Sequence, residues 1–556
     1  MARKKALFAC VLLLLALGTG LWLSGFFSLL LLGLDTGQAS WTLYPQYLQQ
    51  LDSAAVAPHR DAITAAGALG FGLPGLLWLG FAVLMLKSKA KALHGDARFA
   101  TSGDLAAKGL FKDADRGVVV GRHGGKLVKL DGQQFVILAA PTRSGKGVGV
   151  VIPNLLEYRD SMVVLDIKQE NFDLTSGWRD SIGHKVYLFN PFAEDRRTHR
   201  WNPLTYVSGD PAFRVSDLMS IAAMLYPDGA DEQKFWISQA RNAFMAFALY
   251  LFDNLDDARA LGFPHIRTPT LGAVYRLSSG DGTELKPFLR KLAARPFLTG
   301  PAKNAFANLL SQADETFASI MGTLKEPLNA WINPVLDAAT SDDDFNLNDL
   351  RKKRMTIYIG IQPNKLAEAR LIVNLFFSQL INQNTRELPQ ANPELKHQCL
   401  LLMDEFTAIG RVDIIANAVS YMAGYNIRLL PIIQSTSQLD AVYGKERSRT
   451  IITNHALQIV FAPREQQDAN DYSEMLGYTT VRRKSVTRGR DVSRSEVVER
   501  RALMLPQELK AMGTDKEIFF FEGIEHPVMC DKIAYYKDRR FTEKLLPKVN
   551  IPALNV

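Results

Sequence analysis

The sequence predicts an α/β protein in which a parallel sheet is interrupted by a helical segment and preceded by two membrane-length helices. Runs rich in β-branched and aromatic residues lie on both sides of a helical stretch at about 205–345. Helical patterns alternate with these runs, which is typical of a parallel sheet with helices on its faces. Near the N-terminus, two long stretches contain no charged residue.

The two uncharged stretches cover residues 6–34 and 62–86. Each exceeds the roughly 20 apolar residues that a helix needs to cross a bilayer. A cleaved signal peptide is the alternative for the first stretch, but this run is too long for a typical signal core. Residues 1–90 are therefore expected to form a transmembrane anchor with a short loop at 35–61.

Charged residues around the anchor predict its orientation. The 35–61 loop contains three aspartates and one arginine, whereas the flanking segments outside the two stretches are basic: Arg3, Lys4, Lys5, Lys87, Lys89 and Lys91. Basic residues stay on the cytoplasmic side of a membrane. Both termini and the bulk of the chain are therefore expected in the cytoplasm.

The composition sets broad limits on the class of protein. A chain of 556 residues is long enough for two or three domains. Its 65 basic and 57 acidic residues give a formal charge of +8, which permits binding to nucleic acid or acidic lipid without requiring it. The three cysteines lie far apart and form neither a disulfide framework nor a metal-like spacing, which fits a reducing compartment.

Ten segments after the anchor are expected to be strands. They are residues 117–121, 126–130, 134–139, 161–166, 185–192, 354–361, 397–406, 427–435, 456–463 and 517–523. A helix is expected at about 366–384. The predicted organisation is an α/β domain at 91–204 and 346–556, interrupted by an all-α domain at 205–345.

A candidate phosphate-binding loop, AAPTRSGKGVGV, follows the strand at 134–139 and precedes a helical pattern. It departs from G-x-x-x-x-G-K-[ST] at Ala140, in the first glycine position, and at Gly147, in the hydroxyl position. In such loops, backbone N–H groups and a lysine bind the phosphates. The residues expected around the phosphates are Pro141, Thr142, Arg143, Ser144, Gly145, Lys146, Gly147 and Val148. Ser144, Thr142 or a water molecule could replace the missing hydroxyl, and a chance glycine-rich turn is the alternative for the loop alone.

Two further strands end in polar residues that suit nucleotide chemistry. LLLMDEF places Asp404 and Glu405 at the carboxyl end of one strand, where open α/β sheets bind ligands. Asp404 is expected to hold Mg²⁺, directly or through water, and Glu405 to activate the attacking water. Gln434 ends the strand IIQS and is expected to sense the terminal phosphate. A solvated acidic turn explains the carboxylates alone, but not their occurrence together with the loop.

Basic residues outside the loop give weaker signals. Arg428, Arg447 and Arg449 are candidates for an arginine that acts across a subunit boundary, and each has a solvated face as its alternative. Residues 482–501 contain eight basic and three acidic residues. This stretch is either a basic hairpin that faces DNA or lipid, or a solvated loop.

Together, APTRSGKGVGVVIPNLL, LLLMDEF, IIQSTSQLDAVYG and GDARFA resemble the TraG-like type IV secretion coupling proteins, which are membrane-anchored conjugative ATPases. The resemblance extends through about Asp538, and the family pattern tolerates glycine after the lysine. It implies a RecA-like P-loop domain with an inserted all-α domain, ATP and Mg²⁺ as cofactors, and a ring of six copies with ATP at the subunit boundaries. By the same resemblance, Lys146 binds phosphate, Asp404 serves Mg²⁺, Glu405 activates water and Gln434 senses nucleotide, while the arginine finger stays open.

The resemblance also implies partners and a location. The protein would lie in the bacterial inner membrane, bind DNA without sequence preference, and receive a relaxase–DNA complex with its accessory proteins, or secreted effectors. It would pass this substrate to a type IV secretion channel and its ATPase components. One alternative is an FtsK-like DNA translocase. The other is a substrate receptor that uses nucleotide only for assembly.

Overall fold

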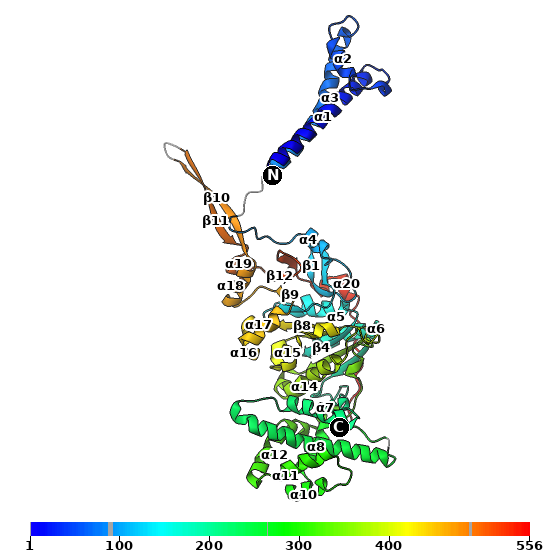
Figure 1. Cartoon of the computed structure of the whole chain (residues 1–556), viewed down its shortest axis with the longest axis vertical. Helices are drawn as coiled ribbons and strands as arrows, with labels where there is room; N and C mark the ends of the chain where they lie inside the picture. The colour runs from blue at the N-terminus through cyan, green and yellow to red at the C-terminus, as the bar shows by residue number, and fades with distance from the viewer. Residues whose placement is uncertain (1, 87–92, 264, 489–491) are drawn as a thin grey trace. The chain divides into compact units, whose positions relative to one another are not determined.

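The computed structural model describes residues 2–86, 93–263, 265–488 and 492–556 (Figure 1). It contains two compact units, Met1–Leu93 and His94–Val556. In the first unit, α1 (Ala2–Leu31) packs along α3 (Arg60–Leu86), and α2 (Leu43–Gln49) lies between them in sequence. Phe8–Leu31 and Ala57–Val83 are long and apolar enough to cross a membrane, which supports the predicted anchor.

Small residues allow the two long helices to approach closely. A Cβ added to Gly70 would lie 2.5 Å from the backbone nitrogen of Ser24. Membrane helices associate through such small-residue contacts because lipid provides no hydrophobic drive between them. The first unit is therefore a helical hairpin whose packing suits a bilayer.

The second unit is built on an eleven-stranded mixed sheet in the order β2-β1-β13-β12-β9-β3-β8-β7-β4-β6-β5. The strands are β1 (Val118–His123), β2 (Lys126–Leu130), β3 (Val136–Ala139), β4 (Ser161–Ile167), β5 (Lys185–Phe189), β6 (Met355–Ile361), β7 (Cys399–Met403), β8 (Ile427–Ile433), β9 (Leu457–Val460), β12 (Lys516–Phe521) and β13 (Val528–Asp531). From β9 to β5 neighbouring strands are parallel, and from β9 to β2 they are antiparallel. All ten predicted strands are present, and β13 was not predicted.

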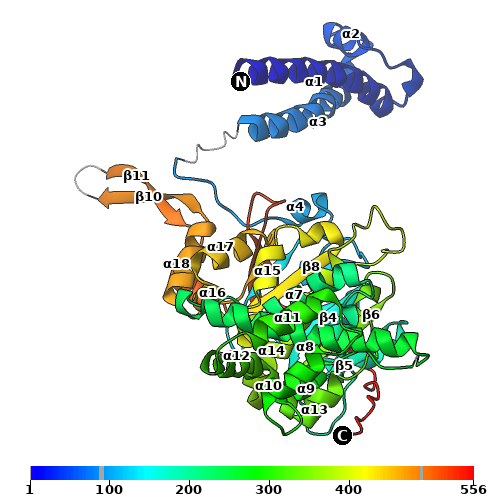
Figure 2. The same cartoon turned by 60° about the horizontal axis from the view of Figure 1, so that its bottom comes forward.

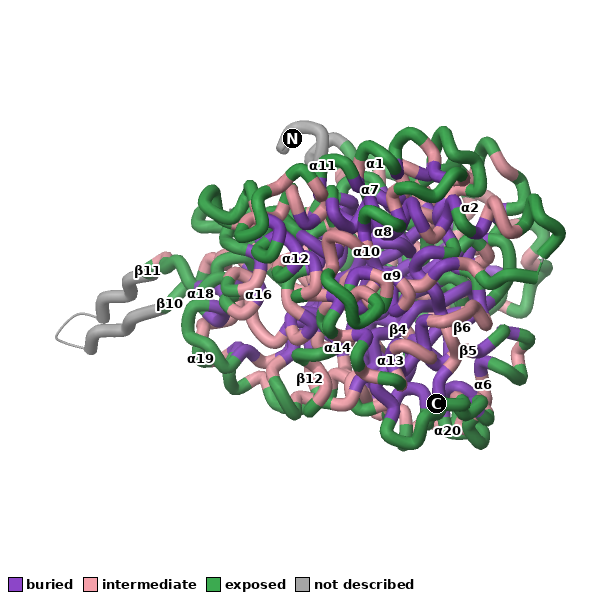
Figure 3. Tube along the Cα trace, turned by 90° about the horizontal axis from the view of Figure 1, so that it is seen from below, coloured by how far each residue is buried: buried purple, intermediate pink, exposed green. Residues whose placement is uncertain are grey.

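Alternate residues of the central strands face two different cores. In β4, Val163 and Leu165 belong to one buried cluster, whereas Met162 and Val164 belong to the other. The first cluster contains α14 (Leu366–Asn384) and most of the other helices, and the second contains α5 (Ile152–Glu157). Burial on both faces explains why these strands read as continuous apolar runs (Figure 3).

Seven helices form the stretch between β5 and β6, as predicted (Figure 2). They are α7 (Pro211–Leu225), α8 (Lys234–Ala260), α9 (Leu271–Ser279), α10 (Leu285–Ala293), α11 (Gly300–Leu310), α12 (Asp314–Leu328) and α13 (Pro334–Ala339). Their apolar side chains are continuous with the core on one face of the sheet. The division into separate domains at 205 and 345 stays a prediction.

The two ends of this helical stretch are tied to each other. Arg200 donates from its backbone N–H and its guanidinium to the carboxylate of Asp344, both at 2.7 Å. The backbone N–H of Asn202 donates to Asp343, and that of Trp201 donates to the carbonyl of Ala339. The chain therefore leaves and re-enters the sheet through a closed stem.

The remaining helices are shorter than α14: α4 (Ser102–Ala107), α6 (Glu170–Ser181), α15 (Asp413–Ala418), α16 (Thr436–Tyr443), α17 (Lys445–Thr453), α18 (Gln466–Met475), α19 (Pro506–Lys510) and α20 (Arg539–Thr542). The basic stretch forms a separate two-stranded sheet, β10 (Tyr478–Arg488) and β11 (Val492–Ala502), which extends from the body of the second unit (Figure 1).

Candidate nucleotide-binding site

The candidate phosphate loop runs from the end of β3 to the start of the helix that contains α5. Its first residue, Ala140, donates its N–H to the carbonyl of Ile433 in β8 at 2.9 Å. Arg143 and Gly145 have positive φ angles of 58° and 87°, whereas Ala140 does not, so an alanine side chain is tolerated there. Residues Gly147–Val151 form a π-helical turn that continues into α5, and such turns are frequent at functional sites.

The four residues predicted to do chemistry come together at the carboxyl edge of the sheet. The ammonium group of Lys146 is hydrogen-bonded to Glu405 and lies 3.5 Å from Asp404. The amide of Gln434 donates to the second carboxylate oxygen of Glu405 at 2.9 Å. The hydroxyl of Thr142 in turn donates to the amide oxygen of Gln434 at 3.0 Å. A continuous polar chain therefore links the phosphate loop to the strands β7 and β8.

The two adjacent carboxylates have different acidities. Burial raises the pKa of Asp404, although nearby Lys146 opposes this effect. Burial also acts to raise the pKa of Glu405, but hydrogen bonds from Lys146 and Gln434 outweigh it and hold this pKa below the ordinary value. Glu405 has a left-handed backbone, with φ 54° and ψ 48°, which is uncommon for a residue other than glycine. Strained backbone of this kind clusters at functional sites.

The residues present fit a magnesium–nucleotide complex in which most ligands come from phosphate and water. The described residues contain no group of three or more His, Cys, Asp and Glu side chains that could hold a metal alone. Mg²⁺ bound to nucleotides needs only one or two carboxylates from the protein, and the carboxylate of Asp404 fits this requirement. The hydroxyl oxygen of Ser144 is buried and has no hydrogen-bond partner among the described residues, whereas that of Thr142 is used by Gln434. Ser144 is therefore the better placed of the two hydroxyls to serve a ligand in the loop.

Two residues near the site were missed in the sequence. Lys532, just after β13, donates its ammonium group to the carbonyl of Ser144 at 3.3 Å and lies 3.7 Å from the centroid of the Phe461 ring. Its strand was not predicted, so no pattern pointed to it. Asp166 lies near the carboxyl end of β4, a strand that pairs with β7, and accepts hydrogen bonds from the N–H groups of residues 171 and 172. Burial raises the pKa of Asp166 to about 7.

One of the candidate arginines for a subunit boundary is wrong. Arg428 is 1% exposed, and its guanidinium donates to backbone carbonyls of Gln134, Arg116 and Leu130 at 2.7 to 2.9 Å. It lies at the amino end of β8, the end opposite to Gln434, so it is a structural residue. Arg447 is exposed and paired with Asp413 at 2.7 Å. Arg447 and Arg449 stay predictions.

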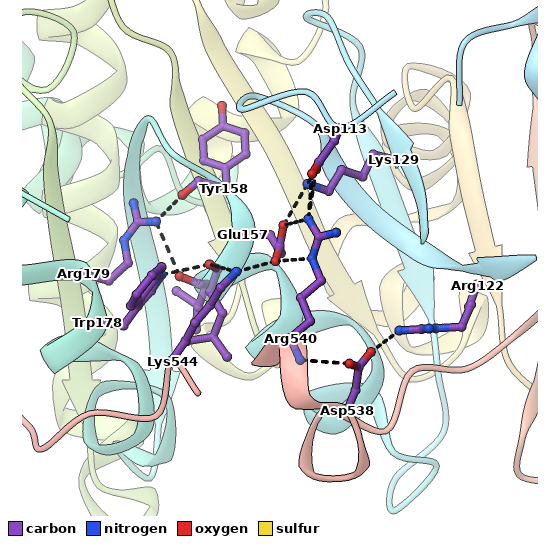
Figure 4. Close-up of polar contacts among 12 residues, drawn as sticks. Asp113, Arg122, Lys129, Glu157, Tyr158, Trp178, Arg179, Asp538, Arg540 and Lys544 are labelled. Atoms are coloured by element: carbon purple, nitrogen blue, oxygen red, sulfur yellow. Dashed lines mark hydrogen bonds and ion pairs between the residues drawn. The ribbon is translucent and has the colours of Figure 1, made fainter. Parts of the chain in front are cut away.

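A buried ion cluster holds the far end of the helix that follows the phosphate loop (Figure 4). Glu157, the last residue of α5, has a 4% exposed side chain and contacts Lys129 at 2.8 Å and Arg540 at 2.6 Å. Lys544 contacts the same carboxylate. Asp113 joins Lys129 and Arg540 from the surface. The C-terminal segment and the β1–β2 region are therefore both fastened to the phosphate-loop helix.

The sheet order, the loop after β3 and the acidic residues after β7 define a RecA-like P-loop protein with a helical insertion. Residues 98–553 match the family model described as Type IV secretory system Conjugative DNA transfer, and the chain belongs to this family. It is 30% identical over 502 residues to Protein VirD4 of Rhizobium radiobacter, covering 87% of this chain and 70% of that protein. It is 28% identical over 507 residues to the conjugal transfer protein TraG of Escherichia coli, covering 83% and 78%.

Solved structures of another coupling protein share the fold. The bacterial conjugative coupling protein TrwBΔN70 in an unbound form aligns with a TM-score of 0.58 at 17% identity, covering 82% of this chain and 98% of that one. TrwB in complex with the ATP analogue ADPNP aligns with a TM-score of 0.56 at 17% identity, covering 84% and 98%. The predicted family and fold class are thus confirmed, and the similarities favour a coupling protein over an FtsK-like translocase.

Proposed function

We propose that this protein is an ATP-hydrolysing coupling protein that delivers a relaxase–DNA or effector substrate to a type IV secretion channel. The observation that carries the proposal is the convergence of Lys146, Asp404, Glu405 and Gln434 at the carboxyl edge of one sheet. The family membership of residues 98–553 and the relatives VirD4 and TraG support the transport role.

Each residue has a role that its contacts suit. Lys146 is held between two carboxylates and is available to exchange them for the β and γ phosphates of ATP. Release from Lys146 leaves Glu405 oriented by the amide of Gln434, with one carboxylate oxygen free to accept a proton from water. Asp404 would serve Mg²⁺, which supplies positive charge to the phosphates. TrwB binds ADPNP and also ADP with Mg²⁺, which supports the same ligands here.

The polar chain also supports a sensing role for Gln434. Its amide oxygen accepts from Thr142 in the loop and its NH₂ group donates to Glu405. A phosphate that shifts Thr142 therefore shifts the orientation of Glu405. From the membership of the conjugative DNA transfer family we infer six copies with ATP between them, with Arg447 or Arg449 acting across the boundary. We infer that the anchor lies in the inner membrane with the N-terminus and the second unit on the cytoplasmic side, because the segments that flank the two apolar stretches are basic.

The test is ATP hydrolysis by the full chain reconstituted in lipid vesicles, with and without DNA. We expect DNA to raise the rate, and Lys146→Ala and Glu405→Gln to abolish turnover. Glu405→Gln should still bind nucleotide, since Lys146 is retained. Lys303→Ala, an exposed change in α11, is the matched control and should keep the wild-type rate.

A receptor that uses nucleotide only for assembly is the second candidate, and Gly147 favours it because the usual metal-binding hydroxyl is missing there. In that case the reconstituted chain would bind ATP but show no turnover above Glu405→Gln under any condition. This outcome would refute the hydrolytic role and leave the coupling role in place.

A further inference from the structure

The ammonium group of Lys532 lies against the phosphate loop, and the roles proposed above for the loop residues give it no part. It donates to the backbone carbonyl of Ser144 at 3.3 Å. Ser144 stands two residues before Lys146, so this bond reaches the turn of the loop itself. Within the part of the chain that the structure describes, the Lys532 side chain makes no other hydrogen bond and no ion pair.

Lys532 is held in place by two neighbouring segments. Its backbone N–H donates to the carbonyl of Asp515 at 2.8 Å. Its ammonium nitrogen lies 3.7 Å from the centroid of the Phe461 ring, and a cation over an aromatic face is attracted to it. Phe461 is fully buried, and its N–H donates at 3.0 Å to the carbonyl of Ala139, the last residue of β3. The ammonium group is therefore fixed relative to the strand that carries the loop.

The buried acid Glu517 does not compete with Ser144 for Lys532. Glu517 is fully buried, and neither of its carboxylate oxygens has a hydrogen-bond partner among the described residues. Burial raises the pKa of this carboxyl well above its ordinary value, although the nearby charge of Lys532 opposes the effect. A neutral acid without a bond to Lys532 leaves the ammonium group to the loop.

The carbonyl that Lys532 holds belongs to the same peptide unit as the N–H of Gly145. This peptide is trans, so its C=O and N–H groups point in opposite directions. Because the carbonyl faces Lys532, the N–H points away from it. The N–H of Gly145 makes no hydrogen bond to any residue that the structure describes. It is therefore a free donor of the kind that phosphate-binding loops offer to an anion.

Glycine would also permit the opposite orientation of this peptide. Gly145 has a φ of 87°, and glycine adopts negative φ angles about as readily. Apart from the adjacent residues, no atom lies within 4 Å of a Cβ added to Gly145, so packing does not select one orientation. In the opposite orientation the oxygen of Ser144 would take the place of the N–H and repel a phosphate. The bond from Lys532 stabilises the orientation that leaves the donor free.

We propose that Lys532 is a positioning residue of the nucleotide site, which holds the Ser144–Gly145 peptide so that the N–H of Gly145 binds the β-phosphate. Backbone N–H groups of such loops cradle the α- and β-phosphates, whereas the loop lysine reaches the β- and γ-phosphates. The proposal rests on nucleotide binding at the site proposed above and does not require hydrolysis.

The test measures equilibrium binding of ADP and of the non-hydrolysable analogue ADPNP to the full chain in detergent with Mg²⁺, by displacement of a fluorescent nucleotide. Lys532→Met keeps an unbranched side chain over Phe461 but removes the donor. The lost bond has a charged, half-buried donor, so we expect about a tenfold loss of affinity. The loss should be equal for the two nucleotides, because both carry a β-phosphate. Lys532→Arg keeps a cationic donor and should recover most of the affinity.

Lys516→Met is the matched control. Lys516 lies on β12 and pairs with Asp531, with side chains 43% and 48% exposed. The change removes one lysine charge from the same pair of strands without touching the loop, so both affinities should stay at the wild-type values. Melting without nucleotide checks the folding of each variant. If the methionine variant does not fold, Lys532→Gln repeats the test, because its amide nitrogen stands one bond short of the ammonium position, and should show the same equal loss.

Two results would overturn the proposal. One is unchanged affinity of folded Lys532→Met for both nucleotides. The other is a loss confined to ADPNP, which would make Lys532 a charge that acts on the terminal phosphate and not a residue that acts through the loop. A wild-type chain that binds neither nucleotide would instead refute the proposed nucleotide site, and this proposal with it.

Discussion

Replacing Glu157 by glutamine tests whether the buried ion cluster holds the phosphate-loop helix in place. The side chain of Glu157 is 4% exposed and that of Lys129 is 3% exposed. Each charge is therefore stabilised by its partner and not by water. Arg540 is 39% exposed and Lys544 is 14% exposed, so water compensates part of their loss. Removing one partner of a buried pair costs about 3–5 kcal/mol, and we expect Glu157→Gln to lower the free energy of unfolding by this amount.

The assay is urea unfolding of the full chain in detergent, followed by tryptophan fluorescence, because Trp178 packs beside Lys544. Lys548→Gln is the matched control. It breaks an exposed pair with Asp173 on the same C-terminal segment, with side chains 59% and 50% exposed, and should cost less than about 1 kcal/mol. Equal losses for the two variants would refute the argument that burial makes the Glu157 cluster strong.

The same cluster predicts a direction of pH dependence. Burial alone would raise the pKa of Glu157, but its three cations hold the pKa far below the ordinary value of 4.5. A group whose pKa is lowered by folding stabilises the protein above its unfolded pKa and loses this contribution as the pH falls. The difference between wild type and Glu157→Gln should therefore be constant above about pH 5 and shrink steadily below pH 4.5. A difference that grows in acid would contradict the assignment.

Three further changes test particular positions. Gly147→Ser should raise the free energy of unfolding by about 0.5 kcal/mol, because no atom lies within 4 Å of the added Cβ and the turn is helical. In a titration of ATPase activity with Mg²⁺, the variant should reach half of its maximal rate at a lower Mg²⁺ concentration than the wild type. Loss of activity in a folded variant would contradict the expectation that a serine hydroxyl fits this position. Arg428→Ala should lower the free energy of unfolding by about 3 kcal/mol, because three backbone carbonyls lose their hydrogen-bond donor. A loss of ATP turnover without a fall in melting temperature would instead support Arg428 as an arginine at a subunit boundary. A carboxyl whose pKa is raised on folding favours the folded state at low pH, so Asp166 should make the wild type lose about 1.4 kcal/mol of stability per pH unit between pH 3.8 and 7. Asp166→Asn should not show this loss. Identical profiles of unfolding free energy against pH for wild type and variant would disprove the argument.

The sequence predicted the parallel strands well because burial on both faces leaves a continuous apolar run. β7 and β8 are buried throughout, and their polar endings, Asp404, Glu405 and Gln434, were predicted to share one edge of the sheet. Because neighbouring parallel strands end at the same edge, these residues lie beside the loop that follows β3. The contacts of Lys146 with both carboxylates followed from this register, although their roles in catalysis stay predictions.

The remainder depends on tertiary contacts that leave no local pattern. β13 is only four residues long and alternates in burial, so Lys532 beside the loop could not be anticipated. The sequence around Arg428 gives no sign that its guanidinium is enclosed by three carbonyls from distant segments. Likewise, the pairing of Gln434 with Thr142 requires knowing that β3 and β8 are neighbours.

The closed stem formed by Arg200 and Asp344 joins the two ends of the crossover between the adjacent parallel strands β5 and β6, so the long helical stretch is inserted without opening the sheet. The helices at 201–343 also contact the sheet domain directly, because they share one apolar core with α14 and one face of the sheet. An exchange of this stretch with that of a relative should therefore keep the geometry of the sheet only where the stem and the apolar residues of the shared core are kept as well.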